Sequence, residues 1–158
     1  AKLSLLEESK EKIGLTSFKS SGVAVLFNDS PLIRRDFSGD TNQDSLIQAS
    51  DLRDLINLLW TSGAEAISIN RQRVTFFSSI SPVGPNILVD NFYMTPPFII
   101  EAAGDSEFMQ QRLLNPDTLT DLKKRTSRLG LNFEISPAPQ IVVPPYTGNL
   151  RTQFLQPL

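Results

Sequence analysis

"SDLRDLINLLWTSGAEAISINRQRV", residues 50–74, passes directly from a helical pattern to a strand pattern, and this succession decides the fold class. Five apolar residues recur at the spacing of one helical face: Leu52, Leu55, Ile56, Leu59 and Trp60. Ser50 is expected to cap the first turn, where Asp51 and Asp54 stabilise the helix dipole. Gly63 supplies a left-handed residue after the last turn. The first half of the stretch is therefore predicted to be an amphipathic helix.

A strand follows this helix after a very short connection, because side chains alternate in character from residue 64 onward. One face carries Glu65, Ile67 and Ile69, and the other carries Ala64, Ala66 and Ser68. The small side chains of the second face suit close approach by a helix.

The pair Asn70-Arg71 separates this strand from a second strand-like stretch, residues 72–77, so a tight hairpin is predicted. Arg71 fits a primed turn poorly, because a positive φ costs it on the order of 1 kcal/mol, and a longer turn or another turn type is the alternative. Asn70, Arg71, Gln72 and Arg73 are the candidate ligand- or partner-binding residues. Arg73 either holds neighbouring backbone carbonyl groups as a structural staple, which is the preferred interpretation, or presents its guanidinium to an anion or a partner.

The remaining patterns add short strands and two helices. A second hairpin around Asp90-Asn91 makes an antiparallel meander with the first, and a further strand follows Pro96-Pro97. Asp105 is expected to cap a short helix, and a second helix is predicted for residues 117–129. "LNFEI", residues 131–135, alternates as a strand, and the prolines after it leave room for little more than one further short strand. The sequence thus predicts an α+β domain with an antiparallel or mixed β-sheet and helices packed mainly on one face.

The chain divides into three parts. Residues 1–17 are interpreted as the end of an N-terminal helix or coiled-coil spacer, with an ordinary amphipathic first helix as the equal alternative. Residues 18–149 form the single α+β domain, and residues 150–158 form a C-terminal tail. Within the domain, the polar stretch 28–48 is a long loop, which is either functional or flexible filler.

Composition excludes several kinds of chemistry. The 158 residues include neither cysteine nor histidine, so the chain has no thiolate nucleophile, no zinc–sulfur site and no imidazole base. A net charge of −2 argues against binding to nucleic acid. Glu65 and Glu101 could meet across the sheet, but nothing in the sequence assigns them a reaction. The basic run "KKRTSR", residues 123–128, is interpreted as a solvated helix face, with an anion site as the less favoured alternative. We therefore predict a protein that is not an enzyme, with no catalytic residue, metal site or cofactor.

Several of these stretches together resemble one family. "DLRDLINLLWTSGAEAISINRQRV", "NILVDNFYMTPPFIIEAAGD", "LGLNFEI" and "IVVPPYTG" are similar in order and content to domain-of-unknown-function family 881, the YlxW/YlxX-like bacterial proteins. The resemblance covers roughly residues 18–149. Arg71 stands where the family usually has glycine, whereas Gln72, Arg73, Tyr146 and Gly148 match the family pattern.

The resemblance implies a location and a role. It implies a membrane-anchored bacterial protein whose anchor precedes residue 1 and whose domain lies on the extracytoplasmic side of the cell membrane. We expect a non-catalytic interaction domain with a protein partner in the cell envelope, linked to cell division or envelope organisation. A homo-oligomer formed through the N-terminal helix is also expected, and a small-ligand-binding or sensory domain is the alternative function.

Overall fold

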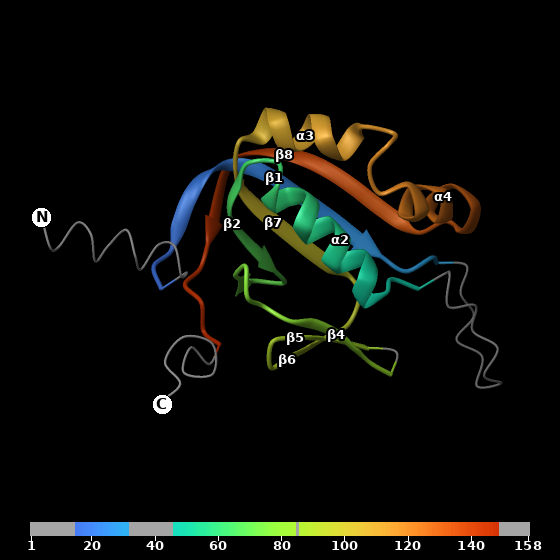
Figure 1. Ribbon diagram of the computed structural model, residues 1–158, viewed down its shortest axis with the longest axis horizontal. Coiled ribbons are helices and arrows are strands. Elements are labelled where there is room, and N and C mark those ends of the chain that lie inside the picture. Colours follow the sequence, from blue (N-terminus) through green and yellow to red (C-terminus); the bar gives the residue numbers. More distant parts are fainter. Residues whose placement is uncertain (1–14, 32–45, 85, 149–158) are drawn as a thin grey trace, which may run out of the picture.

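The computed structural model describes residues 15–31, 46–84 and 86–148 (Figure 1). The elements along the chain are β1 (Phe18–Asn28), α2 (Ala49–Trp60), β2 (Ala64–Ile69), β3 (Gln72–Val74), β4 (Ile80–Val83), β5 (Asn86–Val89), β6 (Phe92–Met94), β7 (Phe98–Gly104), α3 (Ser106–Leu114), α4 (Thr120–Leu129) and β8 (Asn132–Val143). Most of the predicted N-terminal helix or spacer, the centre of the predicted 28–48 loop and the predicted tail lie outside the described residues.

Two antiparallel sheets carry the fold. The larger has the strand order β3-β2-β7-β1-β8, and the smaller has the order β4-β5-β6. Every pairing between these strands is antiparallel. The predicted α+β class is therefore confirmed.

The helices share one face of the larger sheet. Leu55 of α2, Met109 of α3 and Leu122 of α4 belong to the same buried cluster as Val25 of β1 and Ile67 of β2. In Figure 1, α2 crosses in front of β1 and β7, and α3 lies along the upper edge beside β8. Burial of these apolar side chains between helices and sheet is the main stabilising contribution to the domain.

The face of β2 that contacts α2 was predicted wrongly for the residues after Glu65. Ile67 and Ile69 pack in the main cluster with α2, whereas Ala66 packs on the opposite face against Ile141 and Val143 of β8. Ala64, before the bulge in β2, still packs in the main cluster with α2, so only the part of the small face after the bulge receives the far end of β8. Small side chains permit close approach by either kind of element, so their size alone could not identify the neighbour.

Two of the three predicted helix starts need correction. Gln48, and not Ser50, is the N-cap of α2, and its backbone N–H donates to the Asp51 carboxylate at 2.8 Å. Ser50 itself is exposed. The last helix begins at Thr120 and not at 117, after Leu119 in a left-handed conformation. By contrast, Asp105 caps α3 as predicted and accepts a hydrogen bond from the Phe108 N–H at 3.1 Å.

The strands between residues 72 and 143 also differ from expectation. β3 ends at Val74, and the unpredicted β4 begins a second sheet, so the two hairpins do not form one meander. β8 runs for 12 residues through Pro137 and Pro139, although little more than a short strand was expected there. β8 is an edge strand, and a proline is tolerated on the side where no neighbour needs its N–H.

Candidate functional site

The predicted candidate residues form the hairpin between β2 and β3. Ile69 pairs with Gln72, so the loop has two residues, Asn70 with φ 48° and Arg71 with φ 70°. Positive φ at both positions is the requirement of a type I′ turn, whose twist matches the flanking strands. The turn is therefore tight, and the suggestion that Arg71 would force a longer or different turn is wrong.

Three of the four hairpin residues make contacts near the protein surface. The Asn70 side-chain oxygen accepts from the Ile99 N–H at 2.7 Å, which continues the pairing of β2 with β7. The Gln72 side-chain oxygen accepts from the Thr147 hydroxyl at 3.2 Å. Arg71 lies 3.4 Å from the Glu101 carboxylate, but its side chain is 62% exposed, so solvent screens this ion pair.

Arg73 differs from its neighbours because it is buried. Its guanidinium donates to the Thr16 carbonyl at 2.8 Å and to the Pro144 carbonyl at 3.4 Å. These two residues flank β1 and β8, at opposite ends of the domain sequence. The arrangement supports the staple interpretation, in which one side chain holds both terminal segments against the hairpin.

We expect Arg73→Ala to lower the free energy of unfolding by roughly 1–3 kcal/mol, because two backbone carbonyl groups lose a charged donor. Arg71→Ala serves as the control and should be nearly neutral, since exposed ion pairs contribute little. Urea unfolding of the two variants gives the comparison. An Arg73 variant with unchanged stability but weakened partner binding would contradict the staple.

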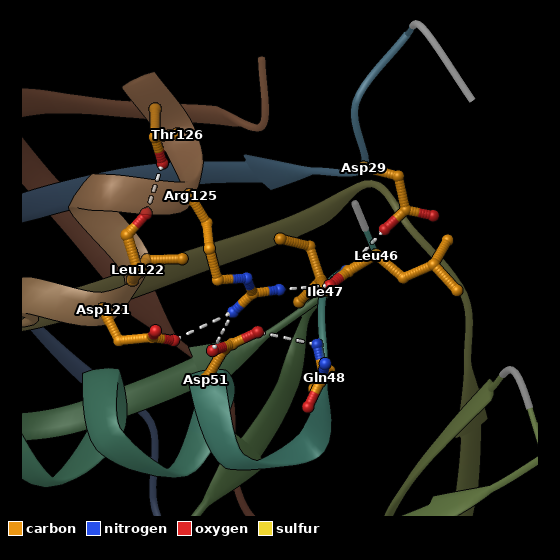
Figure 2. Close-up of polar contacts among 9 residues, drawn as sticks. All are labelled: Asp29, Leu46, Ile47, Gln48, Asp51, Asp121, Leu122, Arg125 and Thr126. Carbon is orange, nitrogen blue, oxygen red and sulfur yellow. Dashed lines mark hydrogen bonds and ion pairs between the residues drawn. The ribbon is translucent and has the colours of Figure 1, made fainter. Parts of the chain in front are cut away.

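The sequence patterns did not indicate a buried ion pair between Arg125 and Asp51. Arg125 of α4 donates to the Asp51 carboxylate of α2 at 2.8 Å, and the two side chains are only 10% and 7% exposed (Figure 2). The Leu46 carbonyl accepts a second bond from this guanidinium at 2.6 Å. Asp51 thus does more than stabilise the helix dipole, and Arg125 does not belong to a solvated face. Its spacing from Leu122 and Leu129 was the overlooked signal, because residues three and four apart share one helical face.

The same cluster fixes the chain on both sides of residues 32–45. Asp29 accepts from the Ile47 N–H at 2.7 Å, which joins the end of β1 to the start of α2 (Figure 2). On α4, Lys123 donates to the Asn115 carbonyl, and partial burial lowers the pKa of this lysine. The Asp29 contact thus holds the residues just before α2, whereas the Lys123 contact ties α4 to the end of α3.

The two glutamates that were considered as a catalytic pair do not meet. Glu101 lies opposite Ser68, whereas exposed Glu65 lies at a bulge three residues earlier in β2, about 10 Å along the strand. Within residues 15–31, 46–84 and 86–148, no group of three or more acidic side chains is placed to hold a metal ion. The helices in these ranges are all too short or too polar to cross a membrane.

An apolar groove lies between α2 and the first strands that follow β2, and we call it the α2 groove. Its volume is about 400 Å³. It is lined by Arg53, Ile56, Asn57, Trp60, Thr61, Val74, Thr75, Phe76, Ser78 and Ile80. The rings of Trp60 and Phe76 lie 4.4 Å apart between centroids. The groove is thus an aromatic surface on the opposite side of β3 from the staple contacts of the hairpin.

Two exposed phenylalanines lie on the turn after β3, where Phe76 lines this groove and Phe77 is its neighbour in the chain. Phe76 is 71% exposed and Phe77 is 63% exposed. The turn that carries them is held by its own polar groups, because the Thr75 N–H donates to the Ser78 hydroxyl at 2.8 Å and the Phe77 N–H donates to the Thr75 hydroxyl at 3.2 Å. The sequence assigned these residues to a strand, and the Thr-x-x-Ser spacing that closes the turn was overlooked.

Two further cavities are more polar. One of about 430 Å³ is lined mainly by the ends of β1 and β8, with Asn28, Asp29, Ser30 and Asn132 among its residues. One of about 260 Å³ lies between the first turns of α2 and α4. Neither these two cavities nor the α2 groove includes Arg73.

Comparison with known proteins identifies relatives. Residues 5–156 match the family described as "Bacterial protein of unknown function (DUF881)". UPF0749 protein YlxW of Bacillus subtilis is 30% identical over 103 residues, which are 65% of this chain and 43% of that protein. UPF0749 protein Rv1823 of Mycobacterium tuberculosis is 31% identical over 104 residues, 66% of this chain and 34% of that protein. The chain therefore spans less than half the length of either relative.

The fold also occurs in a solved structure. The crystal structure of an uncharacterized conserved protein from Mycobacterium tuberculosis superposes with a TM-score of 0.72 at 23% identity, and the match covers 100% of both chains. At this identity, the similarity establishes the fold alone.

Proposed function

The chain belongs to the bacterial DUF881 family of proteins of unknown function, and from its surface we propose that it is a non-catalytic domain that binds a partner protein through the α2 groove. One observation carries this proposal: Phe76 and Phe77 are both more than half exposed on a turn beside an apolar groove. Aromatic residues are enriched in the energetically important parts of protein interfaces.

The energy available at this edge is substantial. Burying a phenylalanine side chain contributes about 1.5–3 kcal/mol relative to leaving it in water. The hydrogen bonds of Thr75 and Ser78 already order the turn, so the turn loses little conformational entropy when a partner binds. An exposed aromatic turn that is already ordered is suited to binding.

The small-ligand alternative has less support. A deep pocket lined by Arg73 would favour it, but Arg73 is buried against the carbonyl groups of Thr16 and Pro144. The polar cavity at the ends of β1 and β8 could hold a small polar molecule, yet its Asp29 carboxylate already accepts from Ile47. Catalysis is also disfavoured, because Glu101 pairs with Arg71 and lies apart from Glu65.

We further propose that the domain lies outside the cytoplasmic membrane, anchored by a segment before residue 1, and that its partner is an envelope protein connected with cell division or envelope organisation. Resemblance to the family supports this location. The relatives extend well beyond the matched region, which leaves ample length for other segments in them. Protease added to spheroplasts should digest the domain of the full-length protein, whereas protection until lysis would contradict the proposed location.

We expect Phe76→Ser combined with Phe77→Ser to weaken partner binding by about 10-fold or more, because two apolar anchors are removed. Leu114→Ser is the matched control, since Leu114 of α3 is 67% exposed but does not line the groove. The partner is captured by cross-linking with the full-length protein, and its affinity for each purified variant is then measured. Equal affinities for the control and the double variant would refute the α2 groove as the binding surface.

A further inference from the structure

The shape of the α2 groove restricts what can occupy it. Arg53, Ile56, Asn57, Trp60 and Thr61 follow the helical spacing of one face, so the groove runs along two turns of α2, or about 12 Å. Its volume of about 400 Å³ lies in the range of pockets that enclose a compact ligand. These dimensions fit the side chains of a short peptide segment better than a flat protein surface.

The charge of the groove restricts the occupant further. Arg53 is the only charged residue among those that line it. Arg53 is exposed and has no ion-pair partner among the described residues. A guanidinium at the end of an apolar channel favours a ligand that places a carboxylate there, because arginine and carboxylate form paired hydrogen bonds.

A lipid surface fits these observations less well. Proteins that bind bilayers through exposed aromatic side chains commonly add a cluster of lysines and arginines that attracts anionic headgroups. The α2 groove has Arg53 alone, and the protein has a net charge of −2. A concave channel also buries an inserted side chain on several sides, which a bilayer surface does not require.

We propose that the α2 groove binds a short peptide segment of the partner, with one or two bulky apolar side chains between Trp60 and Ile80 and an acidic residue on Arg53. Arg53 and Trp60 are seven helical positions apart, or roughly 10 Å. In an extended peptide this corresponds to about three positions from the acidic residue to the apolar residue, so that about two residues lie between them. This inference rests on the proposed function and adds the chemistry of the occupant.

Selection from a phage library of random heptapeptides on the purified domain tests this proposal. The expected result is enrichment of peptides that combine Leu, Phe or Trp with Asp or Glu at the stated spacing. With Arg53→Glu, the preference should change from acidic to basic residues. Asn57→Trp, a change at an exposed helix position that fills the groove, should abolish enrichment while the circular dichroism spectrum stays unchanged.

A selected peptide is then synthesised and titrated, with the emission of Trp60 as the reporter, because this is the only tryptophan in the chain. Arg53→Glu should lower the affinity for the peptide by about 10-fold or more. Exchange of the peptide's acidic residue for lysine should restore the affinity of this variant. Enriched peptides without a preference for Asp or Glu would contradict the proposal that Arg53 binds an acidic residue. No enrichment at all would overturn the peptide segment, while the loss of partner binding by the Phe76/Phe77 double variant would still support the proposed function.

Discussion

Asp51→Ala should lower the free energy of unfolding by about 3–5 kcal/mol, because it leaves the Arg125 guanidinium buried without its closest charged partner. The substitution also removes the acceptor of the Gln48 N–H at the start of α2. The cost of an unpaired buried charge exceeds the net contribution of the ion pair itself. The single variant should therefore be much less stable than a double variant in which both residues are replaced by apolar ones of similar size.

Two controls isolate this effect in urea unfolding experiments. Asp121→Ala should change stability by less than about 1 kcal/mol, because the Asp121 side chain is 84% exposed and lies 3.5 Å from Arg125. The double variant Asp51→Leu with Arg125→Met should be more stable than Asp51→Ala alone. If Asp51→Ala and Asp121→Ala changed the free energy of unfolding equally little, the buried ion pair of Asp51 with Arg125 would not hold α2 and α4 together.

Gly22→Ala should destabilise the domain by about 3 kcal/mol or more, because the central strands are too close for a side chain there. A Cβ atom on Gly22 would collide with the backbone carbonyl oxygen of Ala102. Gly22 pairs with Ala103 of β7 and with Ala138 of β8, so relief would require displacing β1 between two neighbours. A close contact with backbone cannot be relaxed by a change of rotamer.

Gly84→Ala provides the matched control. Nothing lies within 4 Å of a Cβ atom at Gly84, and only its φ of +59° opposes the change. We expect a cost of about 1–2 kcal/mol from that conformation. Thermal and urea unfolding of both variants measure the difference, and a Gly22 variant no less stable than the Gly84 variant would show that β1 and β7 are not packed so closely.

Local patterns in the sequence were sufficient for most individual elements. The apolar spacing in α2, the cap of α3 by Asp105 and the turn at Asp90 each depend on residues within one or two turns of chain. Such signals are local, and tertiary packing reinforced them. The hairpin at Asn70 was located in the same way, but the positive φ of Arg71 was not expected. Arg71 adopts it because strand pairing on both sides of the turn outweighs a strain of about 1 kcal/mol.

Long-range relations were not predictable from these patterns. The contact between Asp51 and Arg125 joins residues 74 positions apart, and no local period indicates which carboxylate a buried arginine will reach. The division of the strands between two sheets depends on the turn at Thr75, whose side-chain hydrogen bonds interrupt an otherwise strand-like run. The α2 groove arises where α2 passes β4, so it too depends on tertiary arrangement.

We propose that a partner protein contacts the α2 groove in the cell. The most direct measurement replaces Phe77 by the photoreactive analogue benzoyl-phenylalanine in the full-length protein and irradiates living bacteria. The same replacement at Leu114, which is similarly exposed on α3, is the control. We expect a cross-linked adduct of one defined mass from position 77 and none from position 114. Adducts from position 114 with none from position 77 would contradict it.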